Sequence, residues 1–150
     1  YAEYKSLEEL SQEDAYLVAK AREVSINAWA PYSKFLVGAA VELANGKIVT
    51  GNNQENSAYP SGLCAERVAL FSANANFPNS AVTSIAISAS NSKGLVPEPI
   101  KPCGGCRQAL LEAETRFEKP IRIILDGKNS ILILEGMNNL LPLNFNGSAL

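Results

Sequence analysis

The sequence predicts a layered α/β sandwich, because helical and strand patterns alternate along the chain. Three segments place apolar residues at helical spacing, and five short segments rich in Val, Ile, Leu and Ala are typical of strands. Their order is helix, strand, strand, helix, strand, helix, strand, strand, which favours helices packed against a sheet. Residues 1–150 are expected to form a single domain with a core that needs no disulfides.

The first half of the chain is expected to form a helix, a hairpin and a second helix. The first helix should stop before Pro31, since the residue before proline avoids the helical region. An Asn-Gly pair marks the hairpin turn, because both residues tolerate positive φ. The polar, turn-rich stretch 52–62 has the composition of a functional loop. The expected elements are a helix over about 11–29, strands over 37–43 and 47–51, and a helix over about 64–75.

The second half of the chain is expected to add one helix and three strands. Two of these strands are short and almost wholly apolar, as strands are that lie centrally in a sheet and are buried on both faces. The expected elements are a strand over 82–89, a loop over 91–101, a helix over about 103–117, strands over 121–125 and 131–134, and a helical turn near 137–140.

Composition and charge indicate which binding partners and cellular locations are not expected for this protein. Lys and Arg number 13 and Asp and Glu number 15, and the net charge is -2 without any basic run, so a nucleic-acid partner is not expected. No apolar stretch approaches the roughly 18 residues of a membrane helix. The polar, acidic stretch 1–10 is unlike a signal peptide. An odd count of 3 cysteines argues against a secreted disulfide framework and predicts a reducing, cytoplasmic location.

The cysteines, together with the absence of histidine, are the most informative chemical feature of the sequence. Cys64 is followed two residues later by Glu66, and Cys103 and Cys106 form a Cys-x-x-Cys pair behind Pro102. Three thiolates leave the fourth position of a tetrahedral zinc site open for water, and Glu66 is suitably spaced to act as general acid and base. We therefore predict one catalytic Zn²⁺ with Cys64, Cys103 and Cys106 as its ligands.

Other interpretations of the cysteines stay open at this point. A structural zinc site normally has four protein ligands, and the chain offers no histidine and no fourth cysteine, so Asp or Glu would have to serve. A redox role for the Cys-x-x-Cys pair would leave Cys64 and Glu66 unexplained. A non-catalytic zinc-binding or redox module is therefore one rival to a catalytic centre.

The charge of the predicted site requires a nearby cation. Three thiolates and one Zn²⁺ carry a net charge of about −1, which weakens the metal as a Lewis acid. Arg67 follows Glu66, and Arg107 follows Cys106. An arginine that donates hydrogen bonds to the ligand sulfurs would draw off part of this charge, and we predict this role for Arg67.

Three longer stretches surround the predicted site and the segments beside it. They are Ala30 to Ala40, Asn53 to Arg67 and Pro102 to Gln108. These stretches resemble the cytidine deaminases, specifically the three-cysteine, homotetrameric branch, and the similarity runs from about Ala30 to Phe145. The resemblance implies a three-layer α-β-α sandwich around a five-stranded mixed sheet, and a homotetramer with shared active sites.

The resemblance also implies the reaction. It is the hydrolytic deamination of cytidine and deoxycytidine, in pyrimidine salvage, with a zinc-bound hydroxide as nucleophile and Glu66 as proton shuttle. Asn53 and Glu55 match positions that hydrogen-bond the ribose hydroxyl. Phe35 matches the aromatic residue that packs against the pyrimidine, and the Ala65 backbone matches a contact to the base.

Further matching positions concern a neighbouring subunit. Ala58 and Tyr59 match residues that reach the neighbour's substrate, and Phe145 matches an aromatic residue that covers the base from another subunit. The stretch 144–147 departs from the family, because Asn-Phe-Asn-Gly replaces the Ser-Phe-Gly-Pro pattern common there. Without the resemblance, an aromatic residue such as Phe145 would be interpreted as part of the core.

The nearest alternative enzyme is a related zinc deaminase that acts on a nucleoside analogue or an antibiotic. An antibiotic deaminase is expected to lack the ribose-binding pair formed by Asn53 and Glu55. A deaminase of nucleic acid is disfavoured by the charge of the chain. A small nucleoside is therefore the expected partner.

Overall fold

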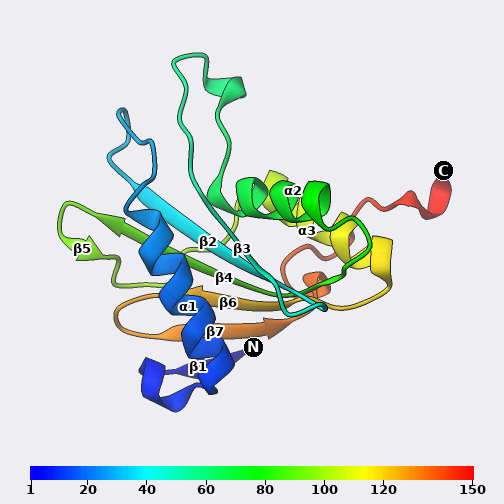
Figure 1. The fold of residues 1–150 in the computed structure, drawn as a ribbon, viewed down its shortest axis with the longest axis horizontal. Coiled ribbons are helices and arrows are strands. Elements are labelled where there is room, and N and C mark those ends of the chain that lie inside the picture. The colour runs from blue at the N-terminus through cyan, green and yellow to red at the C-terminus, as the bar shows by residue number, and fades with distance from the viewer.

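The computed structural model describes the backbone of residues 1–150 and every side chain except that of Ala149. Within this description, a mixed sheet of seven strands forms the middle of three layers. Helix α1 (Gln12–Ser25) packs on one face of the sheet, and α2 (Ala65–Asn76) and α3 (Gly104–Phe117) cover the other (Figure 1). The predicted three-layer α-β-α sandwich is therefore confirmed.

The strands follow the order β1-β7-β6-β4-β2-β3, and β5 pairs with the end of β4. β4 and β6 are parallel, because the crossover through α3 connects them, whereas β2–β4 and β6–β7 are antiparallel. The strands are β1 (Ala2–Tyr4), β2 (Leu36–Leu43), β3 (Ile48–Asn52), β4 (Val82–Asn91), β5 (Gly94–Leu95), β6 (Arg122–Asp126) and β7 (Ile131–Glu135).

The predicted count of five strands is wrong, because β1 and β5 also belong to the sheet. β1 has 3 residues and pairs antiparallel with β7, and β5 has 2 residues and pairs antiparallel with β4. Segments this short show no side-chain period, so only their backbone partners define them as strands. Single turns of 3-10 helix lie at Leu7–Glu9, Tyr59–Ser61, Met137–Asn139 and Gly147–Ala149.

The three predicted helices are present, and the end of α1 differs most from the expectation. α1 ends at Ser25, whereas the pattern predicts a helix to about Trp29. Trp29 instead pairs with a distant loop, since its amide donates to the Asn53 carbonyl at 3.0 Å and its carbonyl accepts from the Glu55 amide at 2.8 Å. Among the described residues, no helix has the length and apolar character that crossing a membrane requires.

Two glycines let helices lie directly on strand backbone. A Cβ at Gly38 would lie 2.0 Å from the carbonyl oxygen of Ala21 in α1, and a Cβ at Gly51 would lie 2.4 Å from the amide nitrogen of Ala69 in α2. Only a residue without a Cβ allows so close an approach. Gly51 thereby sets the first turns of α2 against β3, and these turns carry predicted site residues.

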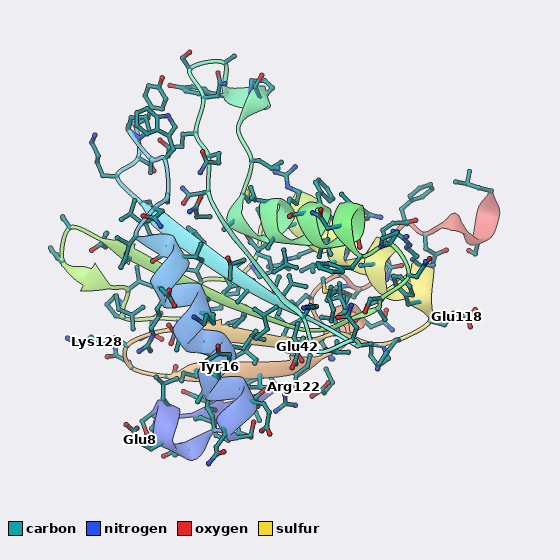
Figure 2. The ribbon with its side chains drawn as sticks, viewed as in Figure 1. Glu8, Tyr16, Glu42, Glu118, Arg122 and Lys128 are labelled. Atoms are coloured by element: carbon teal, nitrogen blue, oxygen red, sulfur yellow. The ribbon has the colours of Figure 1, made fainter. Side chains whose placement is uncertain are left out.

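Charged side chains attach α1 to β6 at two points. Near the start of α1, Asp14 accepts hydrogen bonds from Arg122, with 2.9 Å between Oδ2 and Nη2. Arg122, the first residue of β6, is labelled in Figure 2. Near its end, Arg22 donates to both carboxylate oxygens of Asp126 at 2.7 Å, and the Ser88 hydroxyl donates to the same buried group. Asp14 and Arg22 are eight residues apart in a helix, and Arg122 and Asp126 are four residues apart in a strand. Both separations correspond to about 12–13 Å, so the two pairs can form at the same time.

Candidate metal centre

The three cysteine sulfurs lie together between the starts of α2 and α3. Cys64 is the N-cap of α2, Cys103 is the N-cap of α3, and Cys106 lies in the first turn of α3. The Sγ atoms lie within 4.8 Å of one another, with 3.8 Å from Cys64 to Cys103 and 3.5 Å from Cys103 to Cys106. Sulfurs bound to one tetrahedral zinc ion at about 2.3 Å are about 3.8 Å apart, so this donor set fits Zn²⁺.

The helix starts explain why these sulfurs are available. Cys64 and Cys103 have extended backbone, with ψ of 152° and 167°, as N-cap residues do. In the described structure neither sulfur accepts a capping hydrogen bond from its own helix. The positive end of each helix dipole favours a thiolate at this position. Cys106 is buried and Cys103 is exposed, so the cluster is open to solvent on the Cys103 side.

The sulfurs also influence one another's ionisation. Hydrogen bonding with Cys106, and then with Arg67, lowers the pKa of Cys64 to about 5. The same contact with Cys64, together with burial, raises the pKa of Cys106 above its ordinary value. Cys64 is therefore the more acidic of these two thiols. A metal that binds all three thiolates must displace the remaining protons.

Glu66 is the second residue of α2 and is only 5% exposed. Burial raises the pKa of its carboxyl group, and the nearby Cys64 thiolate acts in the same direction. No Lys or Arg forms an ion pair with Glu66 among the described residues. The structure thus places a buried carboxyl group next to the cysteine cluster without the partner that would neutralise it.

The two arginines that follow the cysteine motifs lie differently. The Arg67 Nη2 atom lies 3.6 Å from the Cys64 sulfur, close enough for the sulfur to accept its hydrogen bond. Its Nε atom is buried and has no hydrogen-bond partner among the described residues. Arg107 donates instead to the carbonyls of Pro102 and Leu140, at 2.8 Å and 2.6 Å. Only Arg67 therefore faces the sulfurs.

Asn53 lies at the start of the loop predicted to bind the sugar, and its side chain is anchored to backbone. Its amide donates to the Phe35 carbonyl at 2.9 Å and accepts from the Val37 amide at 2.8 Å. These bonds use one N–H and one lone pair, so a second of each is left for a ligand. Phe35 itself is half-buried at the entrance to β2, and Ala65 is fully buried at the first residue of α2.

Glu55 is held by the backbone of Tyr32 and Ser33, two residues for which the sequence predicts no role. Its Oε2 atom accepts hydrogen bonds from the amides of Tyr32 and Ser33, at 2.9 Å and 3.2 Å. Hydrogen bonding from Ser33 lowers the pKa of Glu55 below its ordinary value. Both residues lie in the stretch Ala30 to Ala40 that resembles the cytidine deaminases, and this resemblance is the feature of the sequence that could have identified them. A cavity of about 360 Å³ lies among Tyr32, Ser33, Glu55, Asn56 and Tyr59.

The residues predicted to reach a neighbouring subunit lie on the surface of this chain. Ala58 is exposed, and Tyr59 and Phe145 are 79% and 68% exposed. Figure 1 shows the loop before α2 projecting at the top of the view, and the C-terminus at the right. Tyr59 contacts the ring of Tyr32 edge-on, with 6.3 Å between the ring centroids.

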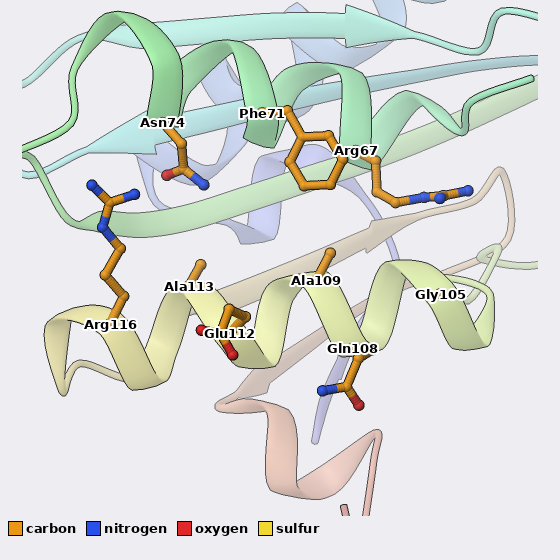
Figure 3. Close-up of a pocket in the computed structure, with 9 residues that line it drawn as sticks. All are labelled: Arg67, Phe71, Asn74, Gly105, Gln108, Ala109, Glu112, Ala113 and Arg116. Carbon is orange, nitrogen blue, oxygen red and sulfur yellow. The ribbon is translucent and has the colours of Figure 1, made fainter. Parts of the chain in front are cut away.

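A groove of about 510 Å³ lies between α2 and α3, beside the metal cluster. Figure 3 shows Phe71 and Arg67 of α2 opposite Ala109 and Ala113 of α3. Phe71 is 46% exposed, although it is a large apolar residue in the middle of a helix. The groove borders the cluster only through Arg67 and the α3 start, so it is a neighbouring feature of the surface.

Comparison with known protein families matches residues 11–118 to the cytidine and deoxycytidylate deaminase zinc-binding region. The chain belongs to this family. The matched residues run from α1 through α3 and include the cysteine cluster and Glu66. The predicted family is thereby confirmed. The prediction of Zn²⁺ as cofactor is confirmed as well, by the zinc-binding family and by a cysteine cluster of suitable geometry.

Individual relatives extend the similarity to most of the chain. The cytidine deaminase of Halalkalibacterium halodurans is 38% identical over 96 residues, which are 64% of this chain and 68% of that one. The cytidine deaminase of Mycobacterium tuberculosis is 35% identical over 109 residues, or 71% and 77% of the two chains. The crystal structure of cytidine deaminase from Burkholderia pseudomallei has a TM-score of 0.76 and 32% identity, covering 91% of this chain and 100% of that one.

Proposed function

We propose that this chain deaminates cytidine and deoxycytidine to uridine and deoxyuridine, with release of ammonia, in a zinc-dependent hydrolysis. The observation that carries the proposal is the cluster of three sulfurs within 4.8 Å, beside the buried Glu66, in a chain of the deaminase family. A structural zinc site would need a fourth protein ligand, which the cluster lacks among the described residues.

Cys64, Cys103 and Cys106 would hold the metal through their thiolates. When bound, Zn²⁺ supplies a Lewis acid that makes water a nucleophile near neutral pH. The chain contributes the open side of the cluster, where Cys103 is exposed and where a water molecule and the substrate can enter. Arg67 donates to the Cys64 sulfur and so withdraws part of the negative charge of the thiolates.

Glu66 moves the protons of the reaction. It takes a proton from the attacking water and delivers it to N3 of the pyrimidine as the water oxygen bonds to C4. It then takes the remaining proton from the hydroxyl group on C4 and passes it to the amino group, so that the C4–oxygen bond becomes a carbonyl as the bond between C4 and nitrogen breaks and ammonia leaves. A raised pKa suits this exchange, because the carboxyl group must both accept and release a proton near neutral pH.

We assign the sugar to Asn53 and Glu55, and the base to Phe35 and Ala65. The free N–H and lone pair of Asn53 and the carboxylate of Glu55 offer a donor and acceptors for the ribose hydroxyl. Phe35 precedes β2 and is suited to pack against the pyrimidine. The backbone of Ala65, next to Cys64, is suited to contact the base edge.

We further propose that the chain is a homotetramer with shared active sites. Three observations support it: Tyr59 and Phe145 are highly exposed, and Phe71 lies exposed beside the groove between α2 and α3. Contacts with other copies would bury these aromatic rings. Ala58 and Tyr59 of one copy, and Phe145 of another, would then complete the substrate site. An active monomer in size-exclusion light scattering would contradict this assembly.

In the cell, we propose that residues 1–150 act as one catalytic domain in pyrimidine salvage. A cytoplasmic location is supported by the three free cysteines, which need a reducing compartment to stay available for metal. A free nucleoside is proposed as the substrate in preference to nucleic acid, since the net charge is -2.

A spectrophotometric assay on protein of measured zinc content tests the proposed function. Cytidine and deoxycytidine should lose their amino groups, whereas CMP and cytosine should not react. Removal of zinc by a chelator should abolish turnover, and added Zn²⁺ should restore it. Turnover of a nucleoside analogue without turnover of cytidine would favour a related deaminase. The absence of any deamination by zinc-loaded protein would favour a non-catalytic zinc-binding module.

A further inference from the structure

Two polar residues directly follow Cys106, and the proposed mechanism uses neither of them. Arg107 donates from Nε to the Pro102 carbonyl at 2.8 Å and from Nη1 to the Leu140 carbonyl at 2.6 Å. Pro102 immediately precedes Cys103, and Leu140 closes the 3-10 turn after β7. One guanidinium group thus joins the cysteine turn to the C-terminal part of the chain.

The geometry of this link makes it rigid. The guanidinium of Arg107 is planar, so its two donors have a fixed spacing and direction. Both acceptors belong to residues that the fold already immobilises, because Pro102 and Leu140 are buried. A lysine would keep the charge but would present a single flexible ammonium, which cannot bridge two carbonyls in one fixed arrangement.

The next residue makes a second link to the same part of the chain. The Gln108 side chain donates from Nε2 to the Phe145 carbonyl at 3.0 Å. Figure 3 shows Gln108 on the side of α3 that points away from Arg67 and Phe71. Arg107 and Gln108 therefore bind the C-terminal segment, defined here as residues 140–146, at its two ends.

Asparagines on both sides of Phe145 add local hydrogen bonds. Asn144 donates to the Leu141 carbonyl at 3.0 Å, and Asn146 accepts from the Ser148 amide at 3.0 Å. The two asparagines also contact each other, with 3.3 Å between Nδ2 and Oδ1. These are two of the three positions at which the chain departs from the Ser-Phe-Gly-Pro pattern, so the departure supplies local hydrogen bonds.

The outcome is an exposed aromatic ring on a fixed backbone. The Phe145 carbonyl is bound by Gln108, while the residue is 68% exposed. A ring on a backbone held in this way has mainly its side-chain torsions to fix when it packs against a ligand, which lowers the entropic cost of binding.

We propose that Arg107 and Gln108 form a tether that positions the C-terminal segment, and with it Phe145, relative to the turn that carries Cys103 and Cys106. The proposal rests on the proposed function, in which Phe145 covers the base bound by another copy. Arg107 and Gln108 are positioning residues, since neither contacts the reacting atoms.

Hydrogen exchange on the zinc-loaded full chain tests the tether without reference to activity. In Gln108→Ala and Arg107→Lys, amides of the C-terminal segment should exchange about two- to tenfold faster than in the unchanged protein. Arg107→Lys should also release zinc to a chelator faster, because the backbone before Cys103 loses its support. Gln12→Ala, an exposed glutamine at the start of α1, is the matched control and should change neither quantity.

A double-mutant cycle then tests the link to Phe145. Gln108→Ala should raise the KM for cytidine about two- to tenfold, with little change in kcat and none in zinc content. In a Phe145→Ala background, the same substitution should have no further effect on KM. Additive effects of the two substitutions would overturn the tether, because Gln108 would then act independently of Phe145.

The proposed function and the tether fail in different ways. If the unchanged protein deaminates cytidine but exchange in the C-terminal segment is the same in Gln108→Ala and Arg107→Lys, the tether is wrong. If exchange increases in both variants but the zinc-loaded protein does not deaminate cytidine, the tether stands and the proposed function is wrong.

Discussion

Buried carboxyl groups on the two faces of the sheet differ in whether a cation within the fold pairs with them. On the α1 face, Asp126 is 0% exposed and accepts two hydrogen bonds from Arg22 and one from Ser88. On the α2–α3 face, Glu66 is 5% exposed, and no ion pair to it is present among the described residues. The first carboxylate is compensated within the fold, whereas the second has no such partner, which agrees with the proton-transfer role proposed for it.

Arg22 and Arg67, on opposite faces of the sheet, differ likewise in how fully their guanidinium groups are hydrogen-bonded. Arg22 directs Nε and Nη2 to the two oxygens of Asp126. Arg67 has a long contact of 3.6 Å to the Cys64 sulfur, and its buried Nε has no partner within the described structure. Buried polar groups are ordinarily satisfied. Unused hydrogen-bonding capacity thus lies on the α2–α3 face, which carries the proposed active site, whereas the polar groups of Arg22 and Asp126 on the α1 face are paired.

The largest expected effect comes from Glu66→Gln, which keeps the shape of the side chain and removes its proton-accepting group. Turnover of cytidine should fall about 10²- to 10⁴-fold with zinc content unchanged. Burial raises the pKa of Glu66, so the ionised carboxylate is unfavourable in the folded state near pH 7. The free energy of unfolding should therefore stay the same or increase. Steady-state kinetics, zinc analysis and thermal denaturation check the three quantities.

The matched control for this substitution is Asp126→Asn, on the other face. It replaces the charged acceptor of Arg22 by a neutral amide and should lower the free energy of unfolding by about 1–3 kcal/mol. Turnover of the folded protein should be retained. Near-normal turnover in Glu66→Gln would refute its role as proton shuttle. Lost turnover in folded Asp126→Asn would contradict the expectation that this residue of the α1 face serves stability and not catalysis.

A second substitution sharpens the contrast on the α1 face. Arg22→Ala leaves the fully buried Asp126 carboxylate without its cation and should lower the free energy of unfolding by about 3 kcal/mol, since breaking a buried pair is strongly destabilising. Asp126→Asn should be milder, because Arg22 is 37% exposed and can turn toward water. Urea denaturation of both variants measures the order, and the reverse order would contradict this account.

A smaller effect than in Glu66→Gln or Arg22→Ala is expected for Arg67→Ala. Loss of the donor to Cys64 should weaken zinc binding about 10- to 100-fold, with a corresponding loss of turnover at limiting zinc. The free energy of unfolding of the metal-free protein should change less than in Arg22→Ala. Competition with a chromophoric chelator gives the zinc affinity. Unchanged affinity and turnover would show that Arg67 does not act on the sulfurs.

The sequence predicts the regular elements well because their patterns are local. The helices over 64–75 and 103–117 and the strand over 82–89 each repeat apolar residues with the period of their structure. β1 and β5 escape prediction because two or three residues have no period. α1 ends earlier than its pattern indicates, because Trp29 pairs with backbone more than twenty residues away.

The candidate site shows the same division. Cysteine spacing and the missing histidine predict zinc and a set of three thiolates to hold it, because donor type and spacing are properties of the sequence. Arg67 and Arg107 could not be separated in this way, since each follows a cysteine motif. Only the directions of the side chains on α2 and α3 show that one reaches a sulfur and the other two carbonyls.

The sequence by itself thus determined the layered fold class, the three candidate zinc ligands and the nearby Glu66, since propensity, period and ligand chemistry act over a few residues. The tertiary structure decided which polar groups are satisfied. Asp126 meets Arg22, and Gln108 meets the Phe145 carbonyl, across long separations in the chain. Hydrogen bonds require donor and acceptor within about 3 Å. For such distant residues, folding alone establishes that proximity.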